Sequence, residues 1–564
     1  MLTIYHGVMD KRSNEDKLRD MKTRLTQLQN DRRRFEEDWT EAETYADSRV
    51  YSWRDLDPVP VRPKRYSSEP AKYKNILVSG LSGYSVSPNI VWFKLGLENQ
   101  SDQDGYKVKD WLEECEEVLI SELNRSNFYD QITKVINDAV VIGHGVMLME
   151  RTPEGRLNFT KTRPNEIYLD VNETGVIDTV YRTYQLTLRQ AVSFFGLENL
   201  DKEYQEAYRD AENWTRKHKF LFAVYPRTDN AGDDPADARN KPFAAYHVDL
   251  EHDTIIEESG YDELPYAIFE WSQIPGLAYS TSPAQDGLDE IKLLNIVTKT
   301  SMQIAQTSAE PPMRISNSIR HLSIVPRGRN YIADPTEIIE PIRTGENYPI
   351  TLQEKESIKQ AVKDWFNVDF FLMLQSRTGQ MTATEVQELQ GEKSAVLSNI
   401  VVSMNTCLSS IIQRCFSLLG RAGKLPPVPA SLQGTGAAMK VDFVGPLSQA
   451  QKRYHSMGGI VSALQYIAPV AQLAPESMDI IDTDELMKRM LNGQQMPQAV
   501  IREDEDIKKI RAARAQQQAA AQARAQQMEM TGNLMSNAGQ LSKAPEDGSL
   551  MNMLNRQLAG GMTR

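Results

Sequence analysis

Histidine side chains are the residues of this sequence best suited to chemistry, because they can transfer protons or bind metals near neutral pH. His144 stands between Gly143 and Gly145 in a loop-like setting. No nucleophile or carboxylate lies at a readable spacing from it, so we predict a structural role. His247 and His252 are five residues apart in HVDLEHD. Strand alternation would place these two on opposite faces, and we predict no metal site there.

Cysteine and glycine patterns also lack a catalytic signature. Cys115, Cys407 and Cys415 form no CxxC or zinc-finger spacing, which favours thiols packed in a core. The segment Gly420-Arg-Ala-Gly-Lys424 lacks the spacing and the hydroxyl residue of a phosphate-binding GxxxxGK[ST] loop, and no HExxH is present. We therefore expect no catalytic residue, no metal ligand and no cofactor.

Composition narrows the class of protein further. The chain has 564 residues, a formal net charge of −13, 25% charged residues and 40% hydrophobic residues, which is typical of a globular protein with several cores. This acidity argues against a protein that holds nucleic acid by neutralising phosphates, but it allows DNA to pass. The apolar runs are short and the N-terminus has no signal-peptide order, so we expect a cytoplasmic protein without a membrane span.

Two long helices, at residues 282–312 and 351–373, position the rest of the chain. Ser282 and Pro283 predict the start of the first helix, and Pro311 with Pro312 predicts its end. A capping box, a threonine at 351 with a glutamate at 354, predicts the start of the second. The apolar faces that we expect to pack in this helix pair contain Leu288, Ile291, Leu294, Ile358, Val362 and Trp365.

Between these helices, residues 313–350 contain short β-like runs and several arginines, which predicts a small β-rich tip. Its arginines could form an interaction surface or could simply solubilise a small sheet, and the sequence favours neither. After the second helix, residues 374–381 form a polar loop interrupted by glycine, followed by a long helix over 382–420 that ends at Gly420. The arginines considered for docking are Arg314, Arg320, Arg327 and Arg329, and the loop contains Ser376, Arg377, Thr378, Gly379 and Gln380.

The remaining segments predict an α+β fold that is mainly helical. Residues 14–46 have one narrow apolar face typical of a peripheral helix or helix pair, with Arg32, Arg33 and Arg34 either on a solvated face or against phosphate. Other expected elements are a helical stretch over 106–139, a hairpin over 145–160 that turns at 153–155, a helix over 187–195, paired strands at 219–225 and 243–248, and helical segments within 421–502. Residues 503–530 are Gln/Ala-rich and helix-forming, and the tail after 531 is expected to be disordered.

Several stretches, in order, resemble one known family. They are SGLSGYSVSPNIVWFKL at 79–95, GYDELPYAIFEW at 260–271, YSTSPA at 279–284 with IKLLN at 291–295, and MTATEV at 381–386. Together they resemble the portal, or head-to-tail connector, proteins of short-tailed bacteriophages, and the resemblance extends from about Glu15 to about Met490.

The resemblance implies a ring of twelve copies at one capsid vertex. Double-stranded DNA would pass through it without sequence specificity, and a terminase motor, tail adaptors, capsid and scaffolding proteins would be its partners. Residues 1–281 would form the wing, 282–312 and 351–373 the stem, 313–350 the clip, 374–381 a tunnel loop facing DNA, 382–420 a wing helix, 421–502 further wing and crown helices, and 503–564 a barrel helix or a disordered tail.

Two other classes of protein, an enzyme and a scaffolding protein, agree less well with the sequence. A packaging ATPase or nuclease would need the signatures that the chain lacks. A helical scaffolding protein would not account for the β segments and hairpin turns. The expected location is the virion, after assembly in the host cytoplasm.

Overall fold

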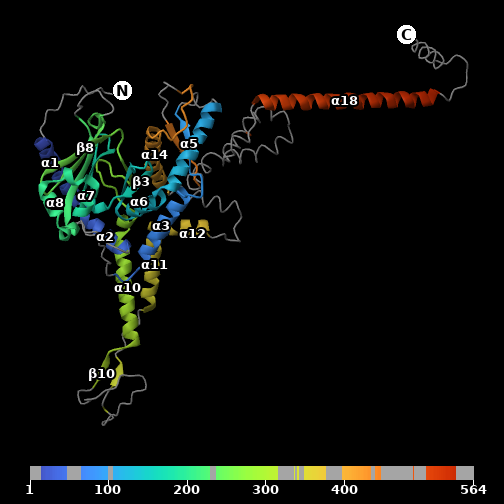
Figure 1. Ribbon diagram of the computed structural model, residues 1–564. Helices are drawn as coiled ribbons and strands as arrows, with labels where there is room; N and C mark the ends of the chain where they lie inside the picture. The colour runs from blue at the N-terminus through green and yellow to red at the C-terminus, as the bar shows by residue number, and fades with distance from the viewer. Residues whose placement is uncertain are drawn as a thin grey trace, which may run out of the picture. The chain divides into compact units, whose positions relative to one another are not determined.

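The computed structural model describes residues 14–47, 65–98, 106–228, 237–315, 336, 339–341, 348–375, 397–432, 439–445, 487 and 504–541 (Figure 1). The chain divides into two compact units, Met1–Ser456 and Met457–Arg564. Both helices and small sheets are present, as the α+β prediction requires. In the described part of the chain, no helix is long and apolar enough to cross a membrane.

The largest sheet is an antiparallel meander of five strands in the order β4-β5-β6-β7-β8. Residues alternate between its two faces: Leu221 packs with Met21 and Leu25 of α1, whereas Phe220 joins the core that contains α7. The predicted pairing of 219–225 with 243–248 is confirmed. The elements of this part are α1 (Asn14–Arg33), β4 (Ile167–Val171), β5 (Ile177–Thr187), α7 (Leu188–Phe195), α8 (Lys202–Ala207), β6 (Lys217–Pro226), β7 (Phe243–Asp249) and β8 (Thr254–Tyr261).

A second sheet, β3-β2-β9, lies against helices α6 and α14. The predicted hairpin is confirmed: β2 (His144–Arg151) pairs with β3 (Leu157–Lys161), and the turn contains Gly155 at a φ of 79°. β9 (Tyr266–Glu270) pairs with the other edge of β2. Within the described ranges, short 3-10 helices lie at Pro164–Glu166, Leu197–Asn199, Ala211–Thr215 and Ala238–Asn240.

Helices surround these sheets. The N-terminal helix pair is confirmed as α1 and α2 (Glu36–Ala46), and α3 (Glu69–Ser85) follows. The helical prediction over 106–139 is confirmed, but the stretch divides at Ser126 and Asn127 into α5 (Tyr106–Arg125) and α6 (Phe128–Ile142). β1 (Phe93–Leu97) pairs with β12 (Met439–Phe443), which comes from the other end of this unit's sequence.

The two long helices form a rod that leads from this body to a small tip (Figure 1). The prediction of one continuous first helix is wrong: it consists of α9 (Pro283–Asp286) and α10 (Leu288–Ala309), separated at Gly287. The second is also interrupted, into α11 (Tyr348–Trp365) and α12 (Val368–Gln375). The tip contains a two-stranded sheet of β10 (Met313–Ile315) and β11 (Ile339–Pro341).

Two predicted helix boundaries are wrong. α11 begins three residues before Thr351, with Pro349 tolerated in its first turn, so Thr351 is not the cap. α14 (Ser398–Arg421) continues past Gly420, and the chain turns at Gly423, whose φ of 66° suits glycine. α18 (Asp504–Leu541) confirms the Gln/Ala-rich helix, but it continues to Leu541, so the expected disorder after 531 is wrong for residues 532–541. The start of the 382–420 helix and the tail beyond 541 lie outside the described residues. So do the residues from 446 to 502, except Met487, where most of the predicted helical segments fall.

Candidate functional site

The rod is held together by apolar side chains that face one another across α10 and α11. Ile291 and Leu294 on α10 and Val362 on α11 are fully buried. Leu288 and Ile358 are half-buried. Five of the six residues predicted to pack in this helix pair therefore face its interior at least in part.

Trp365, the sixth, lies against the first helix at Gly287 but is only partly buried. Its side chain is 39% exposed, and the neighbouring Phe366 is fully buried instead. Its indole lies against Gly287, where an added Cβ would be 2.7 Å from the indole Cγ and Cδ1. The missing side chain at Gly287 thus makes the space in which the indole lies.

Both rod helices are interrupted where they join the body. Gly287 separates α9 from α10, and Asn367, with a φ of 49°, separates α11 from α12. Asparagine is one of the few residues other than glycine that tolerate this left-handed conformation. Beyond the interruption, the ring of Phe371 in α12 lies directly on Gly80 of α3, because a Cβ at Gly80 would be 2.1 Å from a ring carbon.

Polar contacts also attach α10 to the body. The Asn295 Oδ1 accepts hydrogen bonds from the backbone N–H groups of Tyr66 (2.7 Å) and Ser67 (3.2 Å). Lys292 forms an ion pair with Glu41 of α2, and the Lys299 ammonium lies 5.3 Å from the centre of the Tyr66 ring. Ser282 begins α9 as predicted: its hydroxyl accepts from the Gln285 N–H and donates to the Val141 carbonyl. The base of the rod is therefore fixed at several points.

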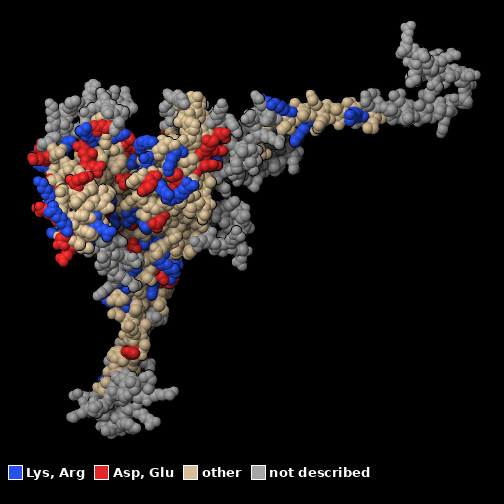
Figure 2. Space-filling view, in the orientation of Figure 1, with Lys and Arg blue, Asp and Glu red and all other residues tan. Residues whose placement is uncertain are grey.

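The distal half of the rod has almost no charge (Figure 2). Residues 300–309 of α10 and 348–353 of α11 include no Asp, Glu, Lys or Arg. Several apolar side chains along the rod are nevertheless open to solvent. They are Leu293, Ile296 (58% exposed) and Met302 on α10 and Leu352 on α11. A rod with this surface is suited to contact with protein and has few groups that could hold phosphate.

Two of the sequence-predicted sites lie mostly outside the described residues. Of the docking arginines, Arg314 is described: it is exposed, and its guanidinium lies 3.5 Å from the Glu340 carboxylate across the β10–β11 pair. Arg320, Arg327 and Arg329 lie outside. The same holds for the whole loop of Ser376, Arg377, Thr378, Gly379 and Gln380.

His144 lies in an aromatic cage. It is buried, and its ring centre is 5.1 Å from that of Trp39 and 5.2 Å from that of Tyr279. Burial, together with the nearby Arg32 charge, lowers the pKa of His144 to about 3. A histidine that stays neutral at physiological pH inside a cage fits the predicted structural role.

The other candidates for chemistry are also engaged in packing. His247 stacks on Phe222 at 4.3 Å between ring centres, whereas His252 bonds to Asp249 (2.8 Å) and Glu203 (3.1 Å). No group of three or more metal-ligating residues is found among the described positions. The three cysteines are buried and free, and burial raises the pKa of each thiol to about 12.

Two buried arginines were missed or misread in the sequence. Arg32 lies neither on a solvated face nor against phosphate: it is buried, and its guanidinium donates to the carbonyls of Asn165 and Ile167, both at 2.9 Å. Arg414 of α14 donates to the Met149 carbonyl through Nε and Nη2, both at 3.1 Å. A signal for Arg32 existed, because it continues the apolar spacing of α1.

Comparison with known proteins now defines the class. A family model described as bacteriophage head to tail connecting protein matches residues 18–501, so the chain belongs to this family, which confirms the resemblance seen in the sequence. It is 26% identical over 523 residues to the portal protein of Salmonella phage epsilon15, covering 89% of this chain and 92% of the relative. It is also 26% identical over 461 residues to the probable portal protein of Bordetella phage BPP-1, covering 79% and 81%.

Two solved structures show weaker likeness. One is from the virion of a native gene transfer agent (GTA) particle, at a TM-score of 0.35 and 10% identity, covering 72% of this chain and 87% of that one. The other is from the neck of an empty GTA particle, at a TM-score of 0.34 and 11% identity, covering 67% and 81%.

Proposed function

We propose that this chain is the subunit of a ring-shaped portal at one capsid vertex. The ring is a structural conduit through which double-stranded DNA enters and leaves, and it is the attachment point for the packaging motor and the tail. The family match over residues 18–501 carries this proposal. The rod supports it, because a distal part that is almost without charge and carries exposed apolar side chains is suited to protein contacts.

The rod is the proposed stem, and we infer that neighbouring copies pack along it. Leu293 and Ile296 are open to solvent in the single chain and lie three residues apart on α10. Cores of protein interfaces are depleted in charged residues, as the distal half of the rod is. Copies related by rotation would cover these side chains, and twelve copies are proposed from the resemblance to the family.

Electron microscopy and native mass spectrometry test the ring and its subunit number. The unaltered chain should form rings with a central hole. Ile296→Asp should give folded subunits that do not assemble, because the charge would be buried between copies. Val176→Asp is the matched control, since Val176 is similarly exposed (60%) but lies at the β4–β5 turn. Intact rings of the Ile296 variant, or an unaltered chain that stays monomeric, would contradict this stem assignment.

The tip is the proposed clip, where the motor and tail adaptors dock. Replacing Arg327 and Arg329 by glutamate should weaken docking and leave the ring intact, because charge complementarity steers association. Arg314→Glu is the comparison, since Glu340 already neutralises Arg314. Equal docking by the double variant and the unaltered ring would count against the clip.

The loop at 376–380 is the proposed contact with passing DNA. One arginine and several uncharged hydrogen-bonding groups per copy could touch the backbone without reading sequence. Deleting Ser376–Gln380, or Arg377→Ala, should permit assembly but impair packaging or retention of DNA. Affinity for bulk DNA should stay low, because the chain carries a net charge of −13. Full packaging by the deleted ring, or tight salt-sensitive DNA binding by the intact one, would refute this role.

The alternative classes have less support. We propose a structural protein, so an ATPase assay on the purified ring should stay at background. A coiled-coil scaffolding protein does not account for the five-stranded sheet. Several points remain predictions. They are the contacts with capsid and scaffolding proteins, a location in the virion after assembly in the host cytoplasm, the division into wing, crown and tunnel loop, and a barrel made of α18 copies.

A further inference from the structure

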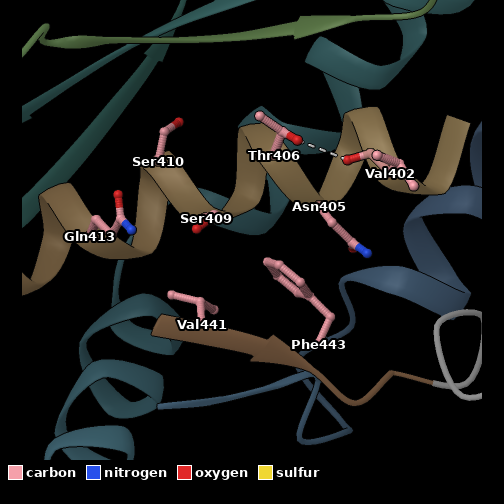
Figure 3. A pocket seen from close by; sticks show the side chains of 8 residues that line it. All are labelled: Val402, Asn405, Thr406, Ser409, Ser410, Gln413, Val441 and Phe443. Atoms are coloured by element: carbon pink, nitrogen blue, oxygen red, sulfur yellow. Dashed lines mark hydrogen bonds between the residues drawn. The ribbon is translucent and has the colours of Figure 1, made fainter. Parts of the chain in front are cut away.

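The groove between α14 and β12 contains no side chain that could act as an acid or a base near neutral pH (Figure 3). Its volume is about 520 Å³, and none of the side chains that line it is charged. The Thr406 hydroxyl there donates to the Val402 carbonyl of its own helix. Side chains that could react with one another are brought together elsewhere, where α2, α3 and α6 meet.

Lys74 of α3 is a buried lysine between these helices. It is 3% exposed, and its Nζ donates to Asn137 Oδ1 of α6 at 2.7 Å. The same Nζ lies 3.0 Å from Asp47 Oδ1, at the end of α2. A buried ammonium needs a paired charge, which Asp47 provides. Three segments of the chain thus place an amine, an amide and a carboxylate in contact.

The Asp47 carboxylate contacts both of the other groups. Its Oδ1 accepts from Lys74 Nζ, whereas its Oδ2 accepts from Asn137 Nδ2 over a longer distance, 3.4 Å. Its backbone is fixed, since the Asp47 N–H donates to the Glu43 carbonyl and the Arg65 guanidinium donates to the Asp47 carbonyl. The carboxylate is therefore held where it can exchange protons with both nitrogens.

The neighbouring charges and apolar side chains leave this arrangement undisturbed. Asp138 and Lys161 already pair with each other at 2.5 Å. Leu77, one turn from Lys74, and Val140, one turn from Asn137, are fully buried in one core. Water therefore has little access to the amine.

We propose that Lys74 and Asn137 form an isopeptide bond with each other, which joins α3 to α6 covalently. Only an uncharged amine attacks a carbonyl, so Asp47 first takes a proton from the Lys74 ammonium. Nζ then bonds to Cγ of Asn137, and the bond from Cγ to Nδ2 breaks. Asp47 transfers a proton to the departing nitrogen, which leaves as ammonia.

The reaction balances without an oxidant, a cofactor or a second substrate. An ammonium and a primary amide become a secondary amide and an ammonium ion, so five N–H hydrogens and one positive charge stand on each side. An amine attacks an amide very slowly in water, but groups held in contact react as if at roughly 10⁵–10⁸ M. The attack requires Nζ to move only from Oδ1 to the adjacent Cγ. Both residues belong to one chain, so the inference does not rest on the proposed ring.

Mass spectrometry of the denatured full chain tests this directly. The mass should be about 17 Da below that of the sequence, which is the mass of the ammonia that is lost. After digestion with trypsin, Lys74 and Asn137 should lie in one branched peptide, because an acylated lysine is not cleaved. A chain with the full mass of its sequence would overturn the proposal.

Asparagine can also lose ammonia to its own backbone, and the digest separates that reaction from the proposed one. A succinimide at Asn137 would give the same loss of mass but would leave Lys74 open to trypsin. Loss of ammonia without the branched peptide would therefore overturn the proposal as well.

Variants of single residues give an independent readout. Lys74→Met removes the nucleophile and Asp47→Ala removes the base, so both chains should keep the full mass of their sequences. Lys134→Met is the control: Lys134 is an exposed lysine of α6 that pairs with Asp130, and its variant should still lose about 17 Da. The same loss in the Lys74 variant would overturn the proposal. The mass of the unaltered chain decides the question even where a variant fails to fold.

Discussion

The contact between Gly287 and Trp365 predicts that Gly287→Ala changes the stability of the rod in opposite directions, depending on whether Trp365 is present. Gly287 has φ −95° and ψ 18°, a backbone conformation that alanine also adopts. Gly287→Ala alone would place a methyl group 2.7 Å from the indole ring. In a chain that already carries Trp365→Ala, the methyl group would have the room that the indole leaves.

The magnitudes follow from opposing effects. Overpacking in a rigid site costs about 1–3 kcal/mol, whereas Gly→Ala at a compatible conformation stabilises by about 0.4–1 kcal/mol. Gly287→Ala should therefore destabilise the rod by about 1–2 kcal/mol in the natural chain and stabilise it by up to about 1 kcal/mol beside Trp365→Ala. Trp365→Ala itself should cost about 2–3 kcal/mol, less than a fully buried tryptophan, because its side chain is 39% exposed.

Hydrogen exchange of peptides from α10 and α11 measures these changes as free energies of local opening. The natural chain, both single variants and the double variant form a complete cycle, which should be recorded on dissociated subunits. Gly83→Ala in α3 is the control, because nothing lies within 4 Å of a Cβ added there. It should stabilise α3 by about 0.5–1 kcal/mol with or without Trp365.

A stabilising effect of Gly287→Ala in the natural chain would refute the reasoning. It would mean that the indole moves aside without loss, so the contact does not define the joint. Equal costs of Gly287→Ala in both backgrounds would refute it as well, because the two residues would then not be coupled.

Three further outcomes are expected. Gly80→Ala should destabilise the contact between α3 and α12 by about 1–3 kcal/mol, because the Phe371 ring occupies the position of the new methyl group. A urea titration followed by hydrogen exchange measures this change, and an unchanged midpoint would contradict it. Arg414→Met should lower the free energy of unfolding, measured by thermal denaturation, by about 1–3 kcal/mol, since the buried Met149 carbonyl loses its donor. Arg414→Lys should not restore both hydrogen bonds. The pKa of His144 is depressed to about 3, so the stability that this residue contributes above pH 6.5 should be lost as the pH falls toward 3, by up to about 1.4 kcal/mol per pH unit. His144→Phe should remove this component of acid unfolding. An identical pH profile of the variant and the natural chain would show that the histidine protonates without cost.

Local signals in the sequence were sufficient to predict where several elements begin, turn or end. Ser282 with Pro283 starts α9, Pro311 with Pro312 follows the end of α10, and Gly155 makes the turn of the β2–β3 hairpin. Such signals act within a few residues, through a cap, a missing N–H or a permitted positive φ. The ordered family stretches were similarly readable, and with them the class of protein.

Strand pairs and contacts between distant segments of the chain could not be predicted from such local signals. β12 was not predicted as a strand, although Gly436 precedes it and Gly445 follows it, because so short a segment becomes a strand only through its partner, β1. The carboxylate of Glu116 closes the far edge of that partner, and no sequence rule connects it with Leu95. The carbonyls that bind Arg32 and Arg414 likewise come from distant segments, so the burial of these charges is a property of the fold.

Within the single helix α11, Trp365 shows the same difference between what the sequence predicts and what the tertiary structure decides. The 3.6-residue period correctly assigned Ile358 and Val362 to the interior of the rod. It also placed Trp365, the last residue of α11, on this face, where the indole contacts Gly287. What the period did not predict is that 39% of this side chain stays exposed. The space that Gly287 leaves for this indole belongs to the tertiary structure, because it depends on residues of two different helices. The interruption between α11 and α12, where Asn367 has a positive φ, was likewise not predicted from the sequence.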